Sequence, residues 1–163
     1  DGEYSETSIP DALDFYGRTK YLGELVSTNS LIIRTSFIGH QLSNKYSLLE
    51  WFLKQNKKCS GYYNSIYSGL PTIEVAEVIE KYIIPKKDLS GLFHLSSKPI
   101  RKFELLTLIK RRYGLKVQVV KDKNFFTNRS LKYEKLKLVI NYEPPSWEKL
   151  INKMFEYKDL SYV

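Results

Sequence analysis

The 163-residue sequence predicts an α/β fold, on two observations. Short runs rich in β-branched residues, which indicate strands, alternate with longer amphipathic segments, which indicate helices; this alternation favours an α/β architecture. The hydrophobic content of 42% is typical of a globular chain, and the length is sufficient to bury a real core. The chain is most simply one domain, or one domain and a fraction of another.

The first predicted helix follows the helix breaker Pro10, within the stretch SETSIPDALDFYGRTKYLGELVSTN. Asp11 or Asp14 is suited to cap its start, because an acid near a helix N-terminus interacts favourably with the helix dipole. The run LIIRTSFIG then predicts a short buried strand. The amphipathic stretch YSLLEWFLKQNKK predicts a second helix, which ends in polar and basic residues.

The turn SGLP precedes a third predicted helix over residues 74–84, with Thr72 as its N-cap. The positions of this helix that are expected to face the core are Val75, Val78, Ile79 and Tyr82. The run GLFHLSS at 91–97 predicts another short strand. His94 lies inside this apolar strand and is interpreted as a core histidine whose hydrogen bonds are satisfied.

Three further elements are predicted in the last part of the chain. The stretch KPIRKFELLTLIKRRYG predicts a helix that ends at Gly114, a suitable C-cap. The run KVQVV alternates as a strand does, and SWEKLINKMFEYK predicts a last helix behind the two prolines at 144–145. The sequence holds no repeats and no low-complexity segments.

The net charge of +8 raises nucleic acid as a partner. The densest basic clusters, at 57–58, 86–87 and 110–112, are interpreted as solvated helix faces and ends, so no nucleic-acid partner is predicted. No apolar run approaches the roughly 20 residues of a membrane span, and no membrane partner is predicted. A single cysteine, Cys59, allows no internal disulfide and favours a reducing, cytoplasmic location. No metal site is predicted.

The segment YGRTK places Tyr16 and Lys20 four residues apart, on one face of a predicted helix. A nearby ammonium group lowers the pKa of a phenol, and a phenol tuned in this way can donate a proton to a carbonyl oxygen while hydride reaches the carbon. The lysine has donors left for a ribose hydroxyl. The same spacing also occurs at Tyr82/Lys86 and Tyr133/Lys137, so spacing alone does not identify a catalytic pair.

Five segments in a fixed order provide the missing context: FYGRTKYLGE, LIIRTS, SGLPTIEVAEVI, GLFHLSS and NRSLKYEKLK. In this order they resemble the C-terminal half of the extended short-chain dehydrogenases, and most closely the dTDP-4-dehydrorhamnose reductase family. Members of that family are NAD(P)H-dependent reductases of nucleotide-linked 4-keto sugars that act in bacterial surface-polysaccharide synthesis. The resemblance implies the C-terminal part of a Rossmann-type fold plus a small α/β substrate-binding domain, with NADPH or NADH as cofactor.

The resemblance also implies roles for particular residues. Tyr16 would be the general acid, and Lys20 its partner on the nicotinamide ribose; both would contact the cofactor. The strand end that would lie beside the nicotinamide, with Phe37 also reaching the sugar, is formed by Thr35, Ser36 and Phe37. The residues that would lie near the nucleotide diphosphate are Arg129, Ser130 and Lys132. The expected partner is a nucleotide-sugar substrate, and a homodimer is left open.

The chain starts at Asp1 and its only methionine is Met154, so it is interpreted as the C-terminal part of something longer. The Gly-rich turn of a dinucleotide-binding domain does not occur in the sequence, and the family's catalytic Ser/Thr would lie before Asp1. The isolated chain is therefore expected to be inactive. The predicted remnants of the NAD(P)-binding domain are 1–40 and 68–97, and the predicted substrate-binding part is 41–67 and 98–163.

Two departures from the family leave alternatives open. Family members often carry an aromatic pair, Trp-x-Tyr, after RTS, whereas this chain has FIGH; Phe37 keeps one ring, and His40 is left without a role. The chain could therefore belong to a sugar-nucleotide epimerase or dehydratase of the same superfamily, or to a reductase-like binding protein without turnover. The sugar, the nucleotide and the choice between NADH and NADPH stay open.

Overall fold

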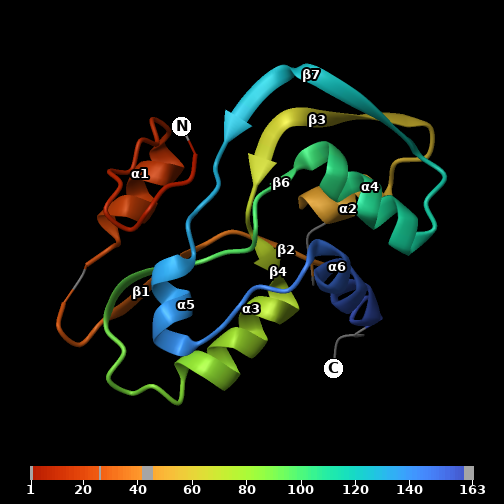
Figure 1. The fold of residues 1–163 in the computed structure, drawn as a ribbon. Coiled ribbons are helices and arrows are strands. Elements are labelled where there is room, and N and C mark those ends of the chain that lie inside the picture. Colours follow the sequence, from red (N-terminus) through yellow and green to blue (C-terminus); the bar gives the residue numbers. More distant parts are fainter. Residues whose placement is uncertain (1, 26, 42–45, 160–163) are drawn as a thin grey trace.

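The computed structural model of the chain describes residues 2–25, 27–41 and 46–159 (Figure 1). Helices and strands alternate along it, as the sequence predicts. In chain order the elements are α1 (Phe15–Leu22), β1 (Leu31–Thr35), β2 (Phe37–Ile38), α2 (Leu48–Leu53), β3 (Lys58–Tyr67), β4 (Leu70–Pro71), α3 (Thr72–Val78), the π-helical turn η1 (Ile79–Ile83), β5 (Gly91–Leu95), β6 (Ile100–Arg101), α4 (Lys102–Tyr113), β7 (Gln118–Asn128), α5 (Glu134–Ile140) and α6 (Trp147–Glu156).

The strands form three small sheets. β1 pairs with β5 and β2 pairs with β4, both in parallel. The third sheet has the order β6-β3-β7, with β7 parallel to β3 and β6 antiparallel to it. β3 and β7 run side by side as an arch above α4 (Figure 1). Parallel pairing across helical connections is the arrangement expected of the predicted α/β class.

One core joins the sheets through the helices. α6 contributes the buried side chains Trp147, Leu150, Ile151 and Met154, and it packs against α4, α3 and β4. α4 buries Leu105, Leu106 and Ile109 toward β3. Each sheet lies within one of the two predicted parts. The strands β1, β2, β4 and β5 fall in residues 1–40 and 68–97, and the strands β3, β6 and β7 fall in residues 41–67 and 98–163. That division stays a prediction, since α6 and α5 pack across it.

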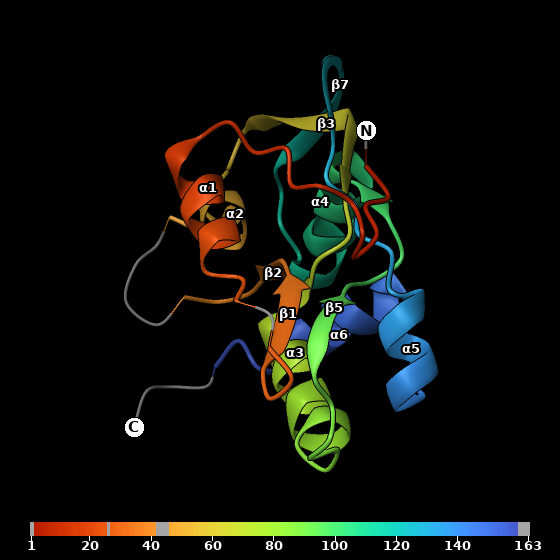
Figure 2. The same cartoon turned by 90° about the vertical axis from the view of Figure 1, so that its left-hand side faces the viewer.

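The N-terminal segment is held against the exit of β7. The Tyr4 amide donates to the Ser130 carbonyl at 2.9 Å, and the Lys132 amide donates to the Tyr4 carbonyl at 2.9 Å. A third hydrogen bond runs from the Glu3 amide to the Ser130 hydroxyl, at 2.8 Å. These bonds bring residues 3–4 and 130–132, far apart in the sequence, together, and they position the approach to α1 (Figure 2).

Two expectations for the third helix are wrong. Its first residue is Thr72, with Pro71 at the N-cap position, and the Thr72 hydroxyl donates instead to the Ile38 carbonyl at 3.3 Å. Ile79 and Tyr82 are exposed, whereas Ile83 is buried. The reason is the π-helical turn η1, since its wider spacing rotates the following side chains relative to an α-helical register.

No sequence pattern predicts β3 or α5. Of the expected short strand KVQVV, the last three residues, 118–120, are the beginning of the eleven-residue β7. β3 is rich in Tyr, Ser and Asn, so it lacks the apolar alternation that marks a strand; its pairing with β7 supplies the stability instead. β1 was expected to be buried but is half-buried, because within the described chain it pairs only with β5.

His94 is fully buried, as expected of a core histidine, but the expectation that its hydrogen bonds are satisfied is wrong. Neither ring nitrogen forms a hydrogen bond of good geometry with the described residues. Burial lowers the pKa of His94, which favours the neutral ring. Separately, none of the described helices is long and apolar enough to cross a membrane.

Candidate functional site

The predicted pair Tyr16/Lys20 lies on α1, a regular helix that the Asp14 side chain caps by accepting from the Gly17 amide at 2.7 Å. The two side chains share one face, and the Lys20 ammonium lies 5.4 Å from the centre of the Tyr16 ring. At this position the ammonium faces the ring rather than the hydroxyl.

The other two pairs with this spacing have different surroundings. Tyr82 lies in the π-helical turn η1 and Lys86 lies beyond it, so they are not four residues apart on one α-helix. Tyr133 is the N-cap of α5, and the ammonium of Lys137 is bound by Glu143. Among the three, Tyr16/Lys20 alone combines a regular helix with a lysine that forms no ion pair in the described chain.

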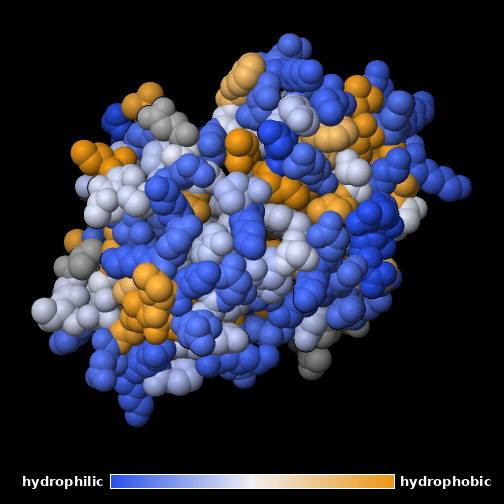
Figure 3. Space-filling view, viewed as in Figure 1, coloured by the Kyte–Doolittle hydropathy of each residue, from blue (hydrophilic) through white to orange (hydrophobic). Residues whose placement is uncertain are grey.

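The helix α1, which carries Tyr16 and Lys20, has no buried residue. Tyr16 is 72% exposed, and the apolar side chains on and beside the helix are similarly open: Ile9, Leu13, Phe15, Leu22 and Leu25. Several hydrophobic side chains stand out around α1 at the upper left of Figure 3. At its end, α1 is tied to β1 by Glu24, which accepts from Arg34 at 2.8 and 2.6 Å. The helix therefore presents both its catalytic candidates and an apolar surface to solvent.

The residues predicted to contact the cofactor lie at the end of β1, directly after Arg34, which binds Glu24. Thr35 ends β1, and its hydroxyl oxygen is buried without a hydrogen-bond partner among the described residues. Ser36 and Phe37 are exposed, Phe37 by 64%. An unsatisfied buried hydroxyl beside an open aromatic ring is a suitable edge for a polar, flat ligand.

Tyr67 is a residue at this strand end that sequence analysis missed. Its hydroxyl is buried beside Ser36 without a hydrogen bond of good geometry among the described residues, and burial raises its pKa to about 12. A side chain at Gly69 would collide with this hydroxyl and with the Ser36 carbonyl, so only glycine fits there. No sequence signal pointed to Tyr67, because it lies at the end of the unpredicted strand β3.

The three residues predicted to lie near a diphosphate occupy the segment after β7. Arg129 and Lys132 are exposed, whereas Ser130 is fully buried. The Ser130 hydroxyl accepts from Glu3 and donates to the Asn128 side chain at 2.8 Å, so it holds the N-terminal segment in place. Its contact with a substrate stays a prediction.

His40, which the sequence left without a role, joins three elements. Its Nδ1 lies 3.3 Å from Glu50 on α2, and its Nε2 lies 2.9 Å from the hydroxyl of Tyr113 at the end of α4. Burial raises the pKa of Tyr113, and the negative charge of Glu50 raises it further by a smaller amount. His40 therefore anchors the segment after Phe37 to the helices on this side of the chain.

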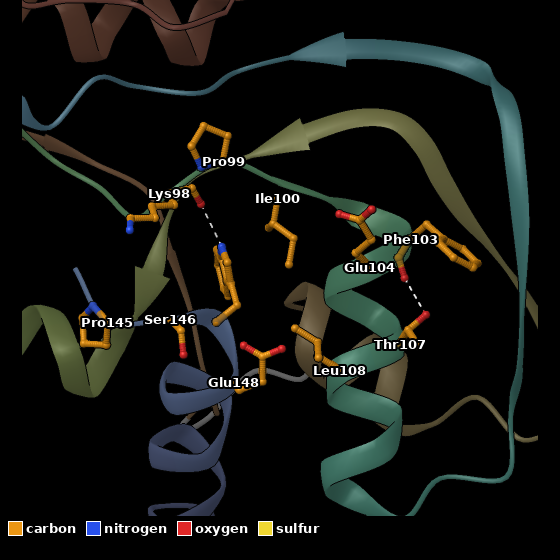
Figure 4. A pocket seen from close by; sticks show the side chains of 11 residues that line it. Lys98, Pro99, Ile100, Phe103, Glu104, Thr107, Leu108, Pro145, Ser146 and Glu148 are labelled. Atoms are coloured by element: carbon orange, nitrogen blue, oxygen red, sulfur yellow. Dashed lines mark hydrogen bonds between the residues drawn. The ribbon is translucent and has the colours of Figure 1, made fainter.

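A separate pocket of about 520 Å³ lies between α4 and α6 (Figure 4). Ile100, Leu108 and Trp147 supply apolar walls, and the carboxylates of Glu104 and Glu148 lie at its edge. The indole N–H of Trp147 is already taken by the Lys98 carbonyl, at 2.8 Å. None of the predicted site residues lines this pocket. Within the described residues, no three His, Cys, Asp or Glu side chains gather in a way that could hold a metal ion.

The fold is of the Rossmann type shared by reductases, dehydratases and epimerases of nucleotide sugars. The particular proteins that this chain resembles are dTDP-4-dehydrorhamnose reductases. One, from Aggregatibacter actinomycetemcomitans, is 28% identical over 107 residues, which cover 60% of this chain and 36% of that protein. No protein-family model matches the chain.

Solved structures give the same fold over nearly the whole chain. The dTDP-4-dehydrorhamnose reductase of Bacillus anthracis, in complex with NADP, matches with a TM-score of 0.80 and 23% identity, over 96% of this chain and 59% of that one. The dTDP-glucose 4,6-dehydratase of the same organism, in complex with NAD, matches with a TM-score of 0.71 and 14% identity, over 98% and 57%. The chain thus spans well under two thirds of the proteins it matches.

Proposed function

We propose that this chain is the C-terminal part of an NAD(P)H-dependent reductase that acts on a nucleotide-linked 4-keto sugar. The observation that carries the proposal is the Tyr16/Lys20 pair, on a regular helix that leads into a parallel strand of a Rossmann-type sheet. The likeness to dTDP-4-dehydrorhamnose reductases in sequence and fold supports the same substrate class. A cytoplasmic role in surface-polysaccharide synthesis, and a homodimer, belong to the same proposal.

In this reductase Tyr16 is the proton donor. The phenol hydrogen passes to the substrate carbonyl oxygen while the carbonyl carbon accepts hydride, and the Lys20 ammonium stabilises the resulting phenolate. NAD(P)H supplies the hydride when it is bound. Thr35, Ser36 and Phe37 border the nicotinamide side, and the unpaired buried hydroxyl of Thr35 fits a polar edge of such a ligand.

The substrate is held at the other end by its diphosphate. Arg129 is exposed beside the N-terminal segment, and its planar guanidinium can bind phosphate oxygens in pairs. Lys132, also exposed, lies close enough in sequence to assist. Cations are the natural holders of a diphosphate, and we expect these contacts to serve binding more than chemistry.

A further polypeptide region completes the site. The exposed apolar side chains of α1, and the edge of β1 that pairs with no strand in the described part of the chain, fit a covering domain that carries the Gly-rich dinucleotide cradle. Relatives contain such additional length, because this chain spans 59% of the Bacillus anthracis reductase. The isolated chain is accordingly inactive and binds NAD(P)H weakly.

The test is Tyr16→Phe in the reductase that contains this chain. Turnover should fall by roughly 10²–10⁴-fold, because a positioned proton donor usually accelerates the reaction by that factor, while NADPH affinity is retained. Tyr82→Phe is the matched control, because it removes the hydroxyl of another Tyr-x-x-x-Lys pair and should leave turnover unchanged. Near-normal turnover in Tyr16→Phe would reject the catalytic pair.

A dehydratase or epimerase of the same superfamily is the second candidate. The observation that favours it is the match to the dTDP-glucose 4,6-dehydratase fold over 98% of the chain. A binding protein without turnover is the third, since the Lys20 ammonium lies over the Tyr16 ring rather than at its hydroxyl. Product analysis separates the first two: a reductase consumes one NAD(P)H per sugar, whereas the others return their cofactor unchanged.

A further inference from the structure

The helix α1 depends on contacts beyond its two ends for its place in the described chain. None of its own residues is buried, so packing does not hold it against the sheets. Directly after its C-cap, Gly23, the Glu24 carboxylate accepts from Nε and Nη2 of Arg34 at 2.8 and 2.6 Å. A two-point contact of this kind fixes orientation as well as distance. The Arg34 and Glu24 side chains are only 18% and 17% exposed, so salt screens this pair less than a surface pair.

The segment that leads to α1 is anchored at the same row of the same sheet. Arg34 on β1 pairs with His94 on β5 (Figure 2). The His94 amide donates to the Glu6 carboxylate at 2.9 Å. Two carboxylates, one before the helix and one after it, are therefore bound to paired residues of β1 and β5. This arrangement restrains the helix from both ends.

The anchored row lies directly beside the predicted site. Arg34 precedes Thr35, the end of β1 that is proposed to border the nicotinamide. Tyr16, the proposed proton donor, lies on α1. A proton donor must come within hydrogen-bond reach of the carbonyl oxygen, and a misplacement of about 1 Å can slow a reaction about a hundredfold. The bond between Glu24 and Arg34 thus connects the donor's helix to the strand beside the cofactor.

We propose that Glu24 and Arg34 are positioning residues of the reductase, which hold the helix α1 in a fixed place beside the end of β1. This inference rests on the proposed function, and it adds two residues that act through the helix rather than on the substrate. Geometry matters here more than charge alone, because the planar guanidinium matches both carboxylate oxygens, whereas an ammonium is a point charge.

The first experiment is steady-state kinetics of Glu24→Gln in the reductase that contains this chain. Glutamine keeps the size of the side chain and removes its charge, so kcat should fall about ten- to a hundredfold as the proton donor is misplaced. The KM for the nucleotide sugar should stay within about threefold, because the cations proposed to bind its diphosphate are not on α1.

Glu77→Gln is the matched control. The Glu77 side chain is 25% exposed and is bound by Lys81 and Lys153, so this variant loses ion pairs of a similar kind, away from β1. Its kcat should stay within about twofold of the wild type. A general loss of stability would affect the two variants alike, so an equal fall of kcat in both would overturn the inference.

A double-mutant cycle tests whether the two residues act through one contact. Arg34→Lys keeps the positive charge but loses the planar fork, so its kcat should fall as that of Glu24→Gln does. The variant with both changes should be no more than about twofold slower than the slower single variant. Losses that multiply would mean that the two residues act separately, which contradicts the proposal.

Amide hydrogen exchange of the 163-residue chain tests the restraint without turnover. Residues 15–23 should exchange about tenfold faster in Glu24→Gln than in the wild type, and at the wild-type rate in Glu77→Gln. Unchanged exchange in Glu24→Gln would show that this bond does not hold the helix.

The Tyr16→Phe variant separates this inference from the proposed function. If Tyr16→Phe loses turnover and Glu24→Gln keeps it, the positioning role is wrong and the proposed function stands. If Tyr16→Phe keeps turnover, the proposed function fails, and the positioning role fails with it.

Discussion

Ser130 connects the N-terminal segment to the end of β7 through one hydroxyl group. It accepts from the Glu3 amide, donates to the Asn128 side chain, and is fully buried. Removing a buried hydroxyl leaves its partners without a hydrogen bond, which costs about 1–3 kcal/mol. The same residue was predicted to touch substrate, so a loss of activity in a Ser130 variant would not by itself identify a substrate contact.

We therefore expect Ser130→Ala to lower the free energy of unfolding by about 1–3 kcal/mol. Ser60→Ala, at an exposed position of β3, should change it by less than about 0.5 kcal/mol. Urea denaturation followed by circular dichroism measures both. Equal stability of the two variants would mean that the Ser130 hydrogen bonds do not hold the N-terminal segment.

Glu77 is one of the carboxyl groups through which acid should act on stability. It accepts from Lys153 on α6 and from Lys81 in η1, both at 2.8 Å, and these bonds, that from Lys153 first, lower its pKa. A carboxyl group with a lowered pKa in the folded state stabilises the fold above its ordinary pKa. This contribution is lost as the pH falls through the lowered value.

The expected result is a fall in the melting temperature of the wild type between about pH 5 and pH 3, with a smaller fall in Glu77→Gln. Glu156→Gln, which removes an exposed carboxyl without an ion pair in the described chain, should follow the wild type. Thermal melts across this pH range make the comparison. Parallel curves for wild type and Glu77→Gln would contradict the assignment.

At the scale of the element, two helix ends differ in the backbone conformation of their glycines. Gly114 closes α4 in the left-handed region, at a φ of 65°, whereas Gly23 closes α1 at a φ of −78°. A side chain meets no atom within 4 Å at Gly114, so only the backbone conformation disfavours it there. Replacing the predicted C-cap Gly114 by a residue with a side chain should therefore lower the free energy of unfolding by a measurable amount.

Gly114→Ala should destabilise the chain by about 1 kcal/mol, because alanine in the left-handed region is strained. Gly23→Ala is the matched control, and it should be neutral or slightly stabilising, since its φ suits any residue. Chemical denaturation of both variants is the measurement. If the order of the two were reversed, the conformation assigned to the end of α4 would be wrong.

The elements that the sequence predicted have local signals, and those it missed do not. α4 and α6 have amphipathic patterns with caps, and Asp14 was one of two expected caps for α1. β3 depends on its partner β7, which is more than fifty residues away, and the π-helical turn η1 shifts a register that a regular periodicity cannot reveal. Short-range patterns carry no information about either.

At the scale of the whole molecule, the candidate site was predictable in part. Tyr16, Lys20 and Thr35 were proposed as site residues from the resemblance; they lie on α1 and at the end of the strand after it, and their roles stay predictions. Tyr67 was not predictable, because its position depends on how β3 pairs with β6 and β7. The exposed surface of α1 was also invisible to the sequence, since an amphipathic pattern does not say what covers it.

The most direct test of the central claim is a paired calorimetric titration of the 163-residue chain, with a dTDP-linked sugar and with NADPH. The account predicts saturable binding of the nucleotide sugar, because Arg129 and Lys132, the cations proposed to bind its diphosphate, lie in this chain. It predicts weak binding of NADPH, because the pyrophosphate of that cofactor requires a Gly-rich turn that the sequence does not contain. Low-micromolar binding of NADPH together with no binding of the nucleotide sugar would contradict it.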